Sequence, residues 1–450
     1  MATSHDRGGA SLVQELFGVN VQEQGRGFYV ALELLAIARG VMLLDPNQLL
    51  APTSGHVTYV RASHDLARRI AVGEELQQEV LASAVQGDAA YETLSALLSS
   101  LLVEVPGRRR TPRWFSSHFY PFVGELVHYD AVQRRGAPAI ERYVFRDGGG
   151  WAYHVLRSDP DGVRRTEARD GLAVLVGDSG TPLGRVAAAL QSHDAARPTE
   201  FTDLSESESE PRDADSPWPE LLRRGVHSIV SRTQVPRAKR TESLMHWVPY
   251  CLARHQLHLA RRALGEPDAM ILLDATHDAN PLRRRSQESL DKFRWNIAKA
   301  LTERAAQHQQ AASERGDVDQ AERWAKFAQP NANITKSPRA FFSETLAAVG
   351  ALNSTSGRRH FTFKPPMLEA LVAALLAPGE EVEFYRFCQR LHTELGLVVD
   401  DRTARSAGLT TDIDAGVFAL NAEAFKLRLA SAGLLTHYSD ATSIIHGEPR

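Results

Sequence analysis

Three helical stretches followed by a short hairpin make up the end of this chain, from Gly357 to Arg450. The helices are predicted at 366–376, 383–395 and 414–432, and they stop at Pro378-Gly379, Gly396 and Gly433. Residues 434–446 then read as two short strands about a Ser-Asp turn. A helix that ends at glycine and opens directly into a hairpin is typical of a winged helix. The sequence therefore predicts a winged-helix-like module at 357–450.

The remaining 356 residues are long enough for further domains, each with its own core. We predict an α+β protein that is mainly helical. The expected parts are a helical domain at 1–110, a small antiparallel β-sheet region at 111–195, an acidic disordered linker at 196–219, a helical domain at 220–356, and the C-terminal module.

The sheet region is predicted from alternating apolar residues and turn residues. Residues 140–146 and 151–157 flank Asp147–Gly150, which reads as a hairpin, and 172–176 reads as a further strand after a turn at 158–162. The linker is predicted from composition, because Glu200–Asp215 holds seven acids and one base, Arg212.

Histidine and cysteine gather in one predicted helix. The cluster comprises His246, Cys251, His255 and His258. Cys251, His255 and His258 share one stripe of a helix, and a thiolate with imidazoles suits zinc. Arg262 falls on the same stripe, and Pro249 is expected to begin the helix and leave His246 outside it. We therefore expect a buried cysteine and hydrogen-bonded histidines, with a metal-dependent enzyme as an alternative.

Two further clusters carry groups that enzymes use. Asp274, His277 and Asp278 follow the apolar run 269–273, but 275–281 reads as a turn and a helix cap. Asp178-Ser179-Gly180 resembles the nucleophile loop of chymotrypsin-like proteases without their upstream context, and is expected to be a turn. A phosphate-binding glycine loop is missing from the sequence. We predict no catalytic residue and no cofactor.

Arginine-rich segments are the candidates for nucleic-acid contact. The residues expected to bind are Arg108, Arg109, Arg110, Arg113, Arg358, Arg359, His360, Lys364, Lys426 and Arg428. A third group, Arg283–Arg285, follows the turn and helix cap at 275–281, and each group alone is more often a solvated surface or an acid-pairing site. Against this, residues 357–450 contain two lysines and eight arginines but twelve acids, a net charge of −2. Because neutralising phosphate drives non-specific affinity for DNA, the module is expected to dock protein first and DNA second.

The run Gly357–Lys364, with Leu368–Val372 and Tyr438–Thr442, resembles the C-terminal part of accessory proteins from bacterial anti-phage defence islands, of the methylation-associated kind that is similar to BREX. The resemblance extends over about the last 200 residues. It implies a non-catalytic subunit that acts beside a DNA methyltransferase and an ATPase.

An adaptor or scaffold subunit of such a defence system is therefore the leading hypothesis, and a direct DNA-binding or regulatory protein is the alternative. Met1–Gly9 is polar and lacks the apolar core of a signal peptide, and the apolar stretch 28–44 is too short and too charged to span a membrane. With only two cysteines, a cytoplasmic protein without a membrane partner is expected.

Overall fold

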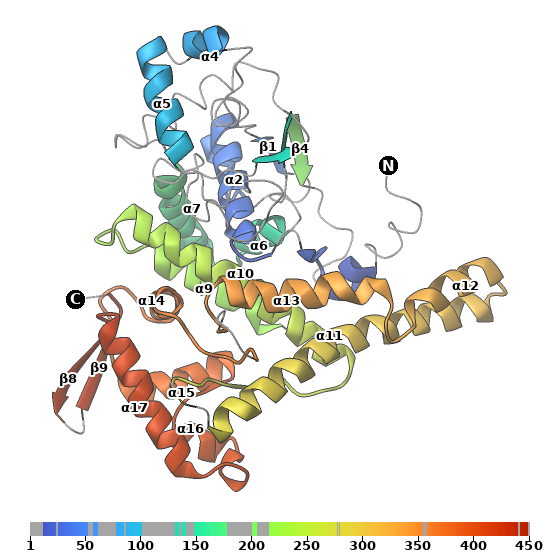
Figure 1. Ribbon diagram of the computed structural model, residues 1–450, viewed down its shortest axis with the longest axis vertical. Coiled ribbons are helices and arrows are strands. Elements are labelled where there is room, and N and C mark those ends of the chain that lie inside the picture. Colours follow the sequence, from blue (N-terminus) through green and yellow to red (C-terminus); the bar gives the residue numbers. More distant parts are fainter. Residues whose placement is uncertain are drawn as a thin grey trace. The chain divides into compact units, whose positions relative to one another are not determined.

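The computed structural model confirms an α+β protein that is mainly helical (Figure 1). It describes residues 12–23, 26–52, 57–61, 78–84, 87–100, 131–134, 137–140, 148–177, 200–204, 216–276, 278, 280–353, 358–439 and 442–448. The chain divides into two compact units, one of Met1–Ala31, Arg146–Asp159 and Ser207–Arg450, the other of Leu32–Phe145 and Pro160–Glu206. Among the described helices, none is both long and apolar enough to cross a membrane.

The second unit mixes helices with short strands. Its elements are most of α2 (Phe28–Leu44), η2 (Pro46–Gln48), β1 (Val57–Arg61), α4 (Gln78–Ala84), α5 (Asp88–Ser100), β2 (Ala131–Arg134), β3 (Ala137–Ile140), α7 (Gly162–Val176) and β4 (Glu200–Leu204). Strand β1 pairs antiparallel with β4, and β2 with β3. The prediction of a disordered acidic linker is wrong at 200–204, because these residues pair with β1 as strand β4.

The predicted hairpin at Asp147–Gly150 is also wrong, because helix α6 (Gly148–Arg157) begins there. A Cβ atom at Gly148 would lie 3.1 Å from Leu252 and 3.2 Å from Val30, so this glycine allows close helix packing rather than a turn. Nearly every residue of α6 is buried. A segment buried on all sides has no clear period, and its aromatic residues imitate a strand.

The strand predicted at 172–176 is instead the end of α7. The Asp161 carboxylate accepts hydrogen bonds from the backbone amides of Val163 (3.0 Å) and Arg164 (3.1 Å). Asp161, in the predicted turn at 158–162, is therefore the N-cap of α7. Helix N-caps and hairpin turns favour the same short polar side chains.

The first unit is built on long helices. They are α9 (Pro217–Val230), α10 (Arg237–Ala263), α11 (Pro281–Glu314), α12 (Val318–Phe327) and α13 (Lys336–Ala348), with η5 (Asn333–Thr335) before the last. Pro249 lies inside α10 rather than at its start, so His246 belongs to the helix. Helix α9 begins within the predicted linker, where Ser216 caps it. Figure 1 shows α11 and α12 side by side as an extended antiparallel pair.

The C-terminal elements confirm the three predicted helices and the hairpin. They are α14 (Pro365–Leu375), β6 (Glu381–Glu383), α15 (Phe384–Leu395), β7 (Leu397–Val398), α16 (Asp401–Ser406), η6 (Leu409–Thr411), α17 (Ala415–Ser431), β8 (Leu435–Ser439) and β9 (Thr442–His446). Strands β6, β9 and β8 form one antiparallel sheet in that order. Gly396 stops α15 in the left-handed region, at φ 64°.

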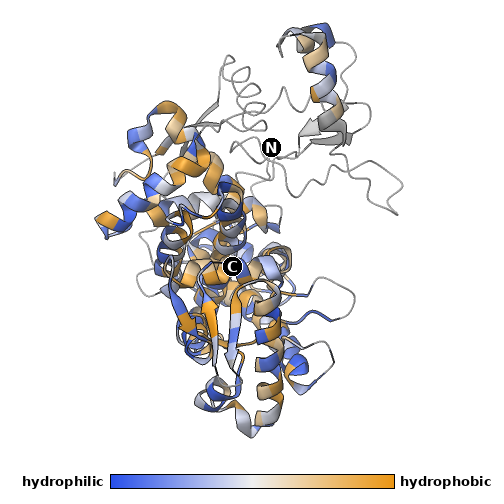
Figure 2. Cartoon of the chain, turned by 90° about the vertical axis from the view of Figure 1, so that its left-hand side faces the viewer, coloured by the Kyte–Doolittle hydropathy of each residue, from blue (hydrophilic) through white to orange (hydrophobic). Residues whose placement is uncertain are grey.

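A two-stranded parallel pair connects this group to the rest of the first unit. Strand β5 (Ile271–Leu272) lies within the apolar run 269–273 and pairs with β7. A core cluster forms around this pair; its buried members are Leu272, Leu282, Val398, Ala404, Ile413 and Phe418. Figure 2 shows that the elements carry both apolar and polar residues, as expected for helices and strands with one face in a core.

Candidate functional site

The two cations predicted to read DNA from α17 point into the protein. Lys426 is 7% exposed, and its Nζ lies 2.7 Å from Glu423 Oε1. The same Nζ lies 5.0 Å from the ring centroid of Phe384 and 5.2 Å from that of Tyr385. Arg428 donates hydrogen bonds to the Thr362 hydroxyl (2.7 Å) and the carbonyl of Phe363. Both side chains therefore hold the module together.

The basic segment that leads into α14 is likewise engaged. Arg358 pairs with Asp291, and Arg359 lies 2.6 Å from Glu344. His360 is buried, and Lys364 is exposed at the N-cap of α14. Acidic partners thus compensate the two arginines that were expected to contact phosphate.

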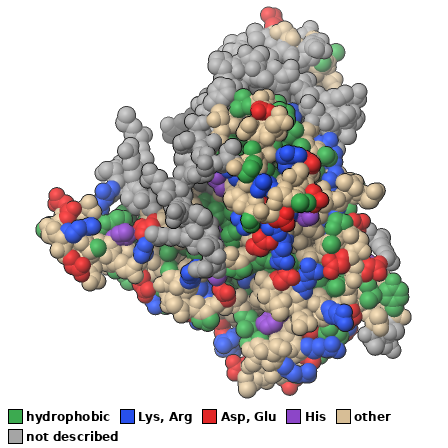
Figure 3. Space-filling model, turned by 180° about the vertical axis from the view of Figure 1, so that it is seen from behind, with side chains coloured by type: hydrophobic (Ala, Val, Ile, Leu, Met, Phe, Trp, Pro, Cys, Tyr) green, Lys and Arg blue, Asp and Glu red, His purple; other side chains and the backbone are tan. Residues whose placement is uncertain are grey.

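The other basic groups add no continuous positive surface among the described residues. Arg108, Arg109, Arg110 and Arg113 lie outside the described residues. Of the group at 283–285, Arg284 and Arg285 both pair with Glu288. On the face of the protein in Figure 3, basic and acidic side chains lie intermixed. A surface that follows a phosphate backbone needs uncompensated cations in a row.

Cys251, His255 and His258 of α10 each have a separate environment and do not form one site. The Cys251 thiol is fully buried, and burial raises its pKa well above the ordinary value. His255 Nδ1 lies 3.0 Å from Ser216 Oγ, and its ring stacks on Trp151. His258 Nδ1 is 2.6 Å from Asp268. Three or more potential metal ligands do not converge anywhere in the described part of the chain.

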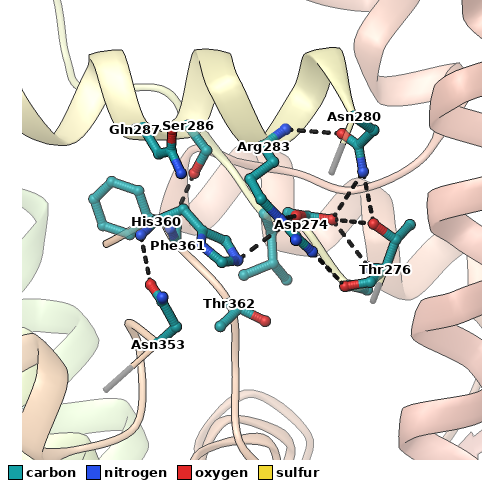
Figure 4. Close-up of polar contacts among 12 residues, drawn as sticks. Asp274, Thr276, Asn280, Arg283, Ser286, Gln287, Asn353, His360, Phe361 and Thr362 are labelled. Atoms are coloured by element: carbon teal, nitrogen blue, oxygen red, sulfur yellow. Dashed lines mark hydrogen bonds and ion pairs between the residues drawn. The ribbon is translucent and has the colours of Figure 1, made fainter. Parts of the chain in front are cut away.

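Asp274 is the centre of the most elaborate polar cluster (Figure 4). It follows β5, at the carboxyl end of the parallel pair, and its side chain is inaccessible to solvent. Its Oδ2 accepts from Arg283 Nε at 2.5 Å and lies 3.6 Å from His360 Nε2. Its Oδ1 accepts from the amide (3.0 Å) and hydroxyl (2.7 Å) of Thr276, and from Asn280 Nδ2 at 3.4 Å. We call these five residues the Asp274 cluster.

The cluster confirms the turn and helix cap that the sequence predicts at 275–281. Asn280 caps α11 by accepting from the amide of Arg283 (2.8 Å), and Arg283 Nη2 donates to the carbonyl of Thr276 (2.8 Å). Of the other two members of the predicted cluster, His277 lies outside the described residues, and Asp278 accepts from Asn280 Nδ2 through its backbone carbonyl at 3.3 Å. The sequence leaves Arg283 either on a solvated surface or paired with an acid, and the structure shows it paired with Asp274, in the first turn of the helix that Asn280 caps.

The electrostatics keep Asp274 charged and His360 neutral. Burial raises the pKa of Asp274, but hydrogen bonds from Thr276 and Arg283 outweigh burial and leave that pKa below its ordinary value. Burial lowers the pKa of His360, and the charge of Asp274 only partly opposes this effect. A carboxylate with a low pKa that is bonded to an arginine is a poor general base.

The cluster instead joins the C-terminal elements to α11. The amide of Asp274 donates to the carbonyl of Phe361 (2.9 Å), and the amide of Phe361 donates to Ser286 Oγ (3.0 Å). From α17, the Asn421 side chain donates to the carbonyls of Leu273 and Val399, both at 2.8 Å, and its Oδ1 accepts from the backbone amide of Ala275 at 2.7 Å. The Asp274 cluster is thus a structural junction.

A groove of about 210 Å³ lies elsewhere, between α9, the end of α14, and α15. Its floor is apolar, and its rim carries Arg224, Arg390 and Glu394. Glu394 pairs with Arg224 at 2.6 Å and with Arg390 at 2.9 Å. The charges on the rim therefore compensate one another. His227 and Ser228 also line the groove, and Ser228 Oγ is hydrogen-bonded to the carbonyls of Ala373 and Leu376.

The outward face of α17 carries two exposed leucines. Leu420 is 70% exposed and Leu427 is 64% exposed, while Phe418, Phe425 and Leu429 pack inward. A surface helix normally turns its apolar side chains to the core and polar ones to water, so leucines on its outward face depart from that pattern. The sequence prediction for this helix rested on its charges; the spacing of Leu420 and Leu427, seven residues apart, is the signal that could have revealed this surface.

No protein-family model, no curated protein and no solved structure matches the chain. The function is therefore inferred from the surfaces and side chains of the chain itself.

Proposed function

We propose that this protein is a non-enzymatic adaptor subunit of a multi-component, DNA-directed bacterial defence system, and that its C-terminal module docks another protein. The observation that carries the proposal is the orientation of side chains on α17. Leu420 and Leu427 point outward, and the two cations, Lys426 and Arg428, point inward. Exposed apolar side chains in a row mark protein interfaces, whereas DNA contact needs exposed cations.

The order of elements supports a winged-helix-like module. Helix α14 is followed by β6, α15, β7, α16, η6, α17 and the hairpin β8–β9, and β6 pairs with β9 to close a three-stranded sheet. In this arrangement α17 occupies the place of a recognition helix. The resemblance of the last 200 residues to accessory proteins of anti-phage islands supplies the setting, with a methyltransferase and an ATPase as the proposed neighbours.

Co-expression with the products of the flanking genes tests the proposal. We expect the full chain to co-purify with at least one of them, and Leu420→Asp to abolish the complex. Val318→Asp is a matched control, because Val318 is 66% exposed but lies on α12. Loss of the complex in both variants, or recovery of the protein alone with all neighbours present, would contradict the proposal.

A gel shift tests the DNA-binding alternative directly. We expect no shift of duplex DNA by the purified chain at low salt, because the described arginines of the segment 358–364 are paired with acids. A shift that salt weakens and that Arg358→Ala with Arg359→Ala abolishes would replace docking by DNA binding as the function.

A further inference from the structure

The exposed residues of α17 follow a regular pattern. Gly416, Leu420, Glu423, Leu427 and Ala430 are spaced alternately by four and three residues. At 3.6 residues per turn they fall within an arc of about 80° and extend along about 21 Å of the helix. Four of the five are exposed and Ala430 is half-buried. We call these five residues the α17 stripe.

The spacing of the α17 stripe is that of a helix-packing seam. Apolar residues that alternate by three and four positions meet a partner helix by inserting side chains between those of the facing helix. Small residues, Ala419 and Ser431, flank the stripe on either side and let a second backbone approach closely. Helix α17 lies at the outside of the C-terminal group of elements (Figure 1).

One charge interrupts the α17 stripe at its centre. Glu423 is 62% exposed, and its one hydrogen bond among the described residues comes from Lys426 Nζ to Oε1. Lys426 approaches from the buried side of the helix, so it does not cover the outward side of the carboxylate. A helix that covers the stripe must supply a donor to Glu423 or leave it desolvated, which costs free energy.

We propose that the α17 stripe binds an amphipathic helix of another protein, with leucine-like residues at the same alternating spacing and a basic residue opposite Glu423. The inference rests on the proposed docking function and specifies its partner. Because Glu423 is the middle residue of the stripe, a central base in the partner meets it whether the two helices run parallel or antiparallel.

A second copy of this chain fits less well. In a parallel pair in register, each Glu423 faces the Glu423 of the other copy, and like charges in contact are destabilising. A centred antiparallel pair also places Glu423 opposite Glu423, and in a shifted register Glu423 faces a leucine or a small residue. The α17 stripe contains no base, so no register of self-pairing supplies a cation to this carboxylate.

The test uses the full chain and two synthetic helical peptides of eighteen residues. Both carry leucines at the alternating spacing; one has arginine and the other glutamate at the central position. We expect fluorescence anisotropy to show binding of the arginine peptide about tenfold more tightly than the glutamate peptide, in the range measured for close charge pairs. Glu423→Lys should reverse the preference, and Leu427→Asp should weaken binding of the arginine peptide at least tenfold.

Val318→Asp serves again as the control and should leave both affinities unchanged. Equal affinity for the two peptides, or an arginine peptide that binds Leu427→Asp as well as the wild type, would overturn the inference. Light scattering that shows a dimer dissolved by Leu427→Asp would also overturn it, in favour of a second copy. If a flanking gene product is lost with Leu420→Asp while neither peptide binds, docking through α17 stands and the helical partner is wrong.

Discussion

Replacing Arg283 by methionine removes the cation from the Asp274 cluster while keeping most of the side-chain volume. Asp274 is inaccessible to solvent, and Arg283 Nε at 2.5 Å is its only full charge partner within hydrogen-bond distance among the described residues. Removing one partner of a buried ion pair leaves an uncompensated charge, which costs about 3–5 kcal/mol. We therefore expect Arg283→Met to lower the free energy of unfolding of the first unit by about that amount.

The neighbouring residue provides a matched control. The Arg284 side chain is 82% exposed and pairs with Glu288 across one helical turn. Exposed pairs of this kind contribute roughly 0–1 kcal/mol, so Arg284→Met should be nearly neutral. Urea unfolding followed by tryptophan fluorescence would measure both variants. Combining Arg283→Met with Asp274→Asn removes both charges and should recover at least half of the loss.

Acid provides a second measure of the same pair. Because the folded pKa of Asp274 lies below its unfolded value, the stability that this group contributes is fully present above about pH 4 and is lost as pH falls through the folded pKa. A protonated Asp274 no longer requires a cation, so the difference between wild type and Arg283→Met should shrink towards pH 3. An effect of Arg283→Met at neutral pH that is no larger than that of Arg284→Met would refute the reasoning.

Further predictions concern other buried groups. The lowered pKa of His360 should make stability fall as pH drops below about 6.5, and His360→Asn should remove that part of the pH profile measured by urea unfolding. Asn421→Leu leaves three backbone groups without their partner and should cost at least about 2 kcal/mol in the same assay. Arg232 is 2% exposed and donates to carbonyls at the end of α14 and to Gly447; Arg232→Met should speed hydrogen exchange in β9. Cys251 should react with thiol reagents only after unfolding.

The C-terminal helices and hairpin could be predicted because their limits depend on local residues. Gly396 and Gly433 adopt positive φ at the ends of α15 and α17, and no side chain other than hydrogen is comfortable there. The parallel pairing of β5 with β7 could not be predicted. It joins Ile271 to Leu397 across 126 positions of sequence, and two-residue strands have no period of their own.

The Asp274 cluster was predictable only in part. The turn and cap at 275–281 are local features, and they were read correctly from Asn280-Pro281. The partners of Asp274 were not, because His360 reaches it from a segment more than eighty residues away. The same limit explains the hairpin predicted at Asp147–Gly150, where packing of Gly148 against Leu252 overrides the local preference for a turn.

Charge in the C-terminal module shows why residue type and residue direction must be considered separately. The net charge of −2 argues against DNA binding only weakly, because a few well-placed cations are enough to contact phosphates. The position of Lys426 is a stronger argument. Its ammonium group is already held by Glu423 and by two aromatic rings, so moving it to a phosphate would give up these contacts and leave Glu423 without its cation. Leu420 and Leu427 lose nothing on docking to protein, since both are already exposed and gain from leaving water. The free-energy balance of α17 therefore favours an apolar partner over a polyanion.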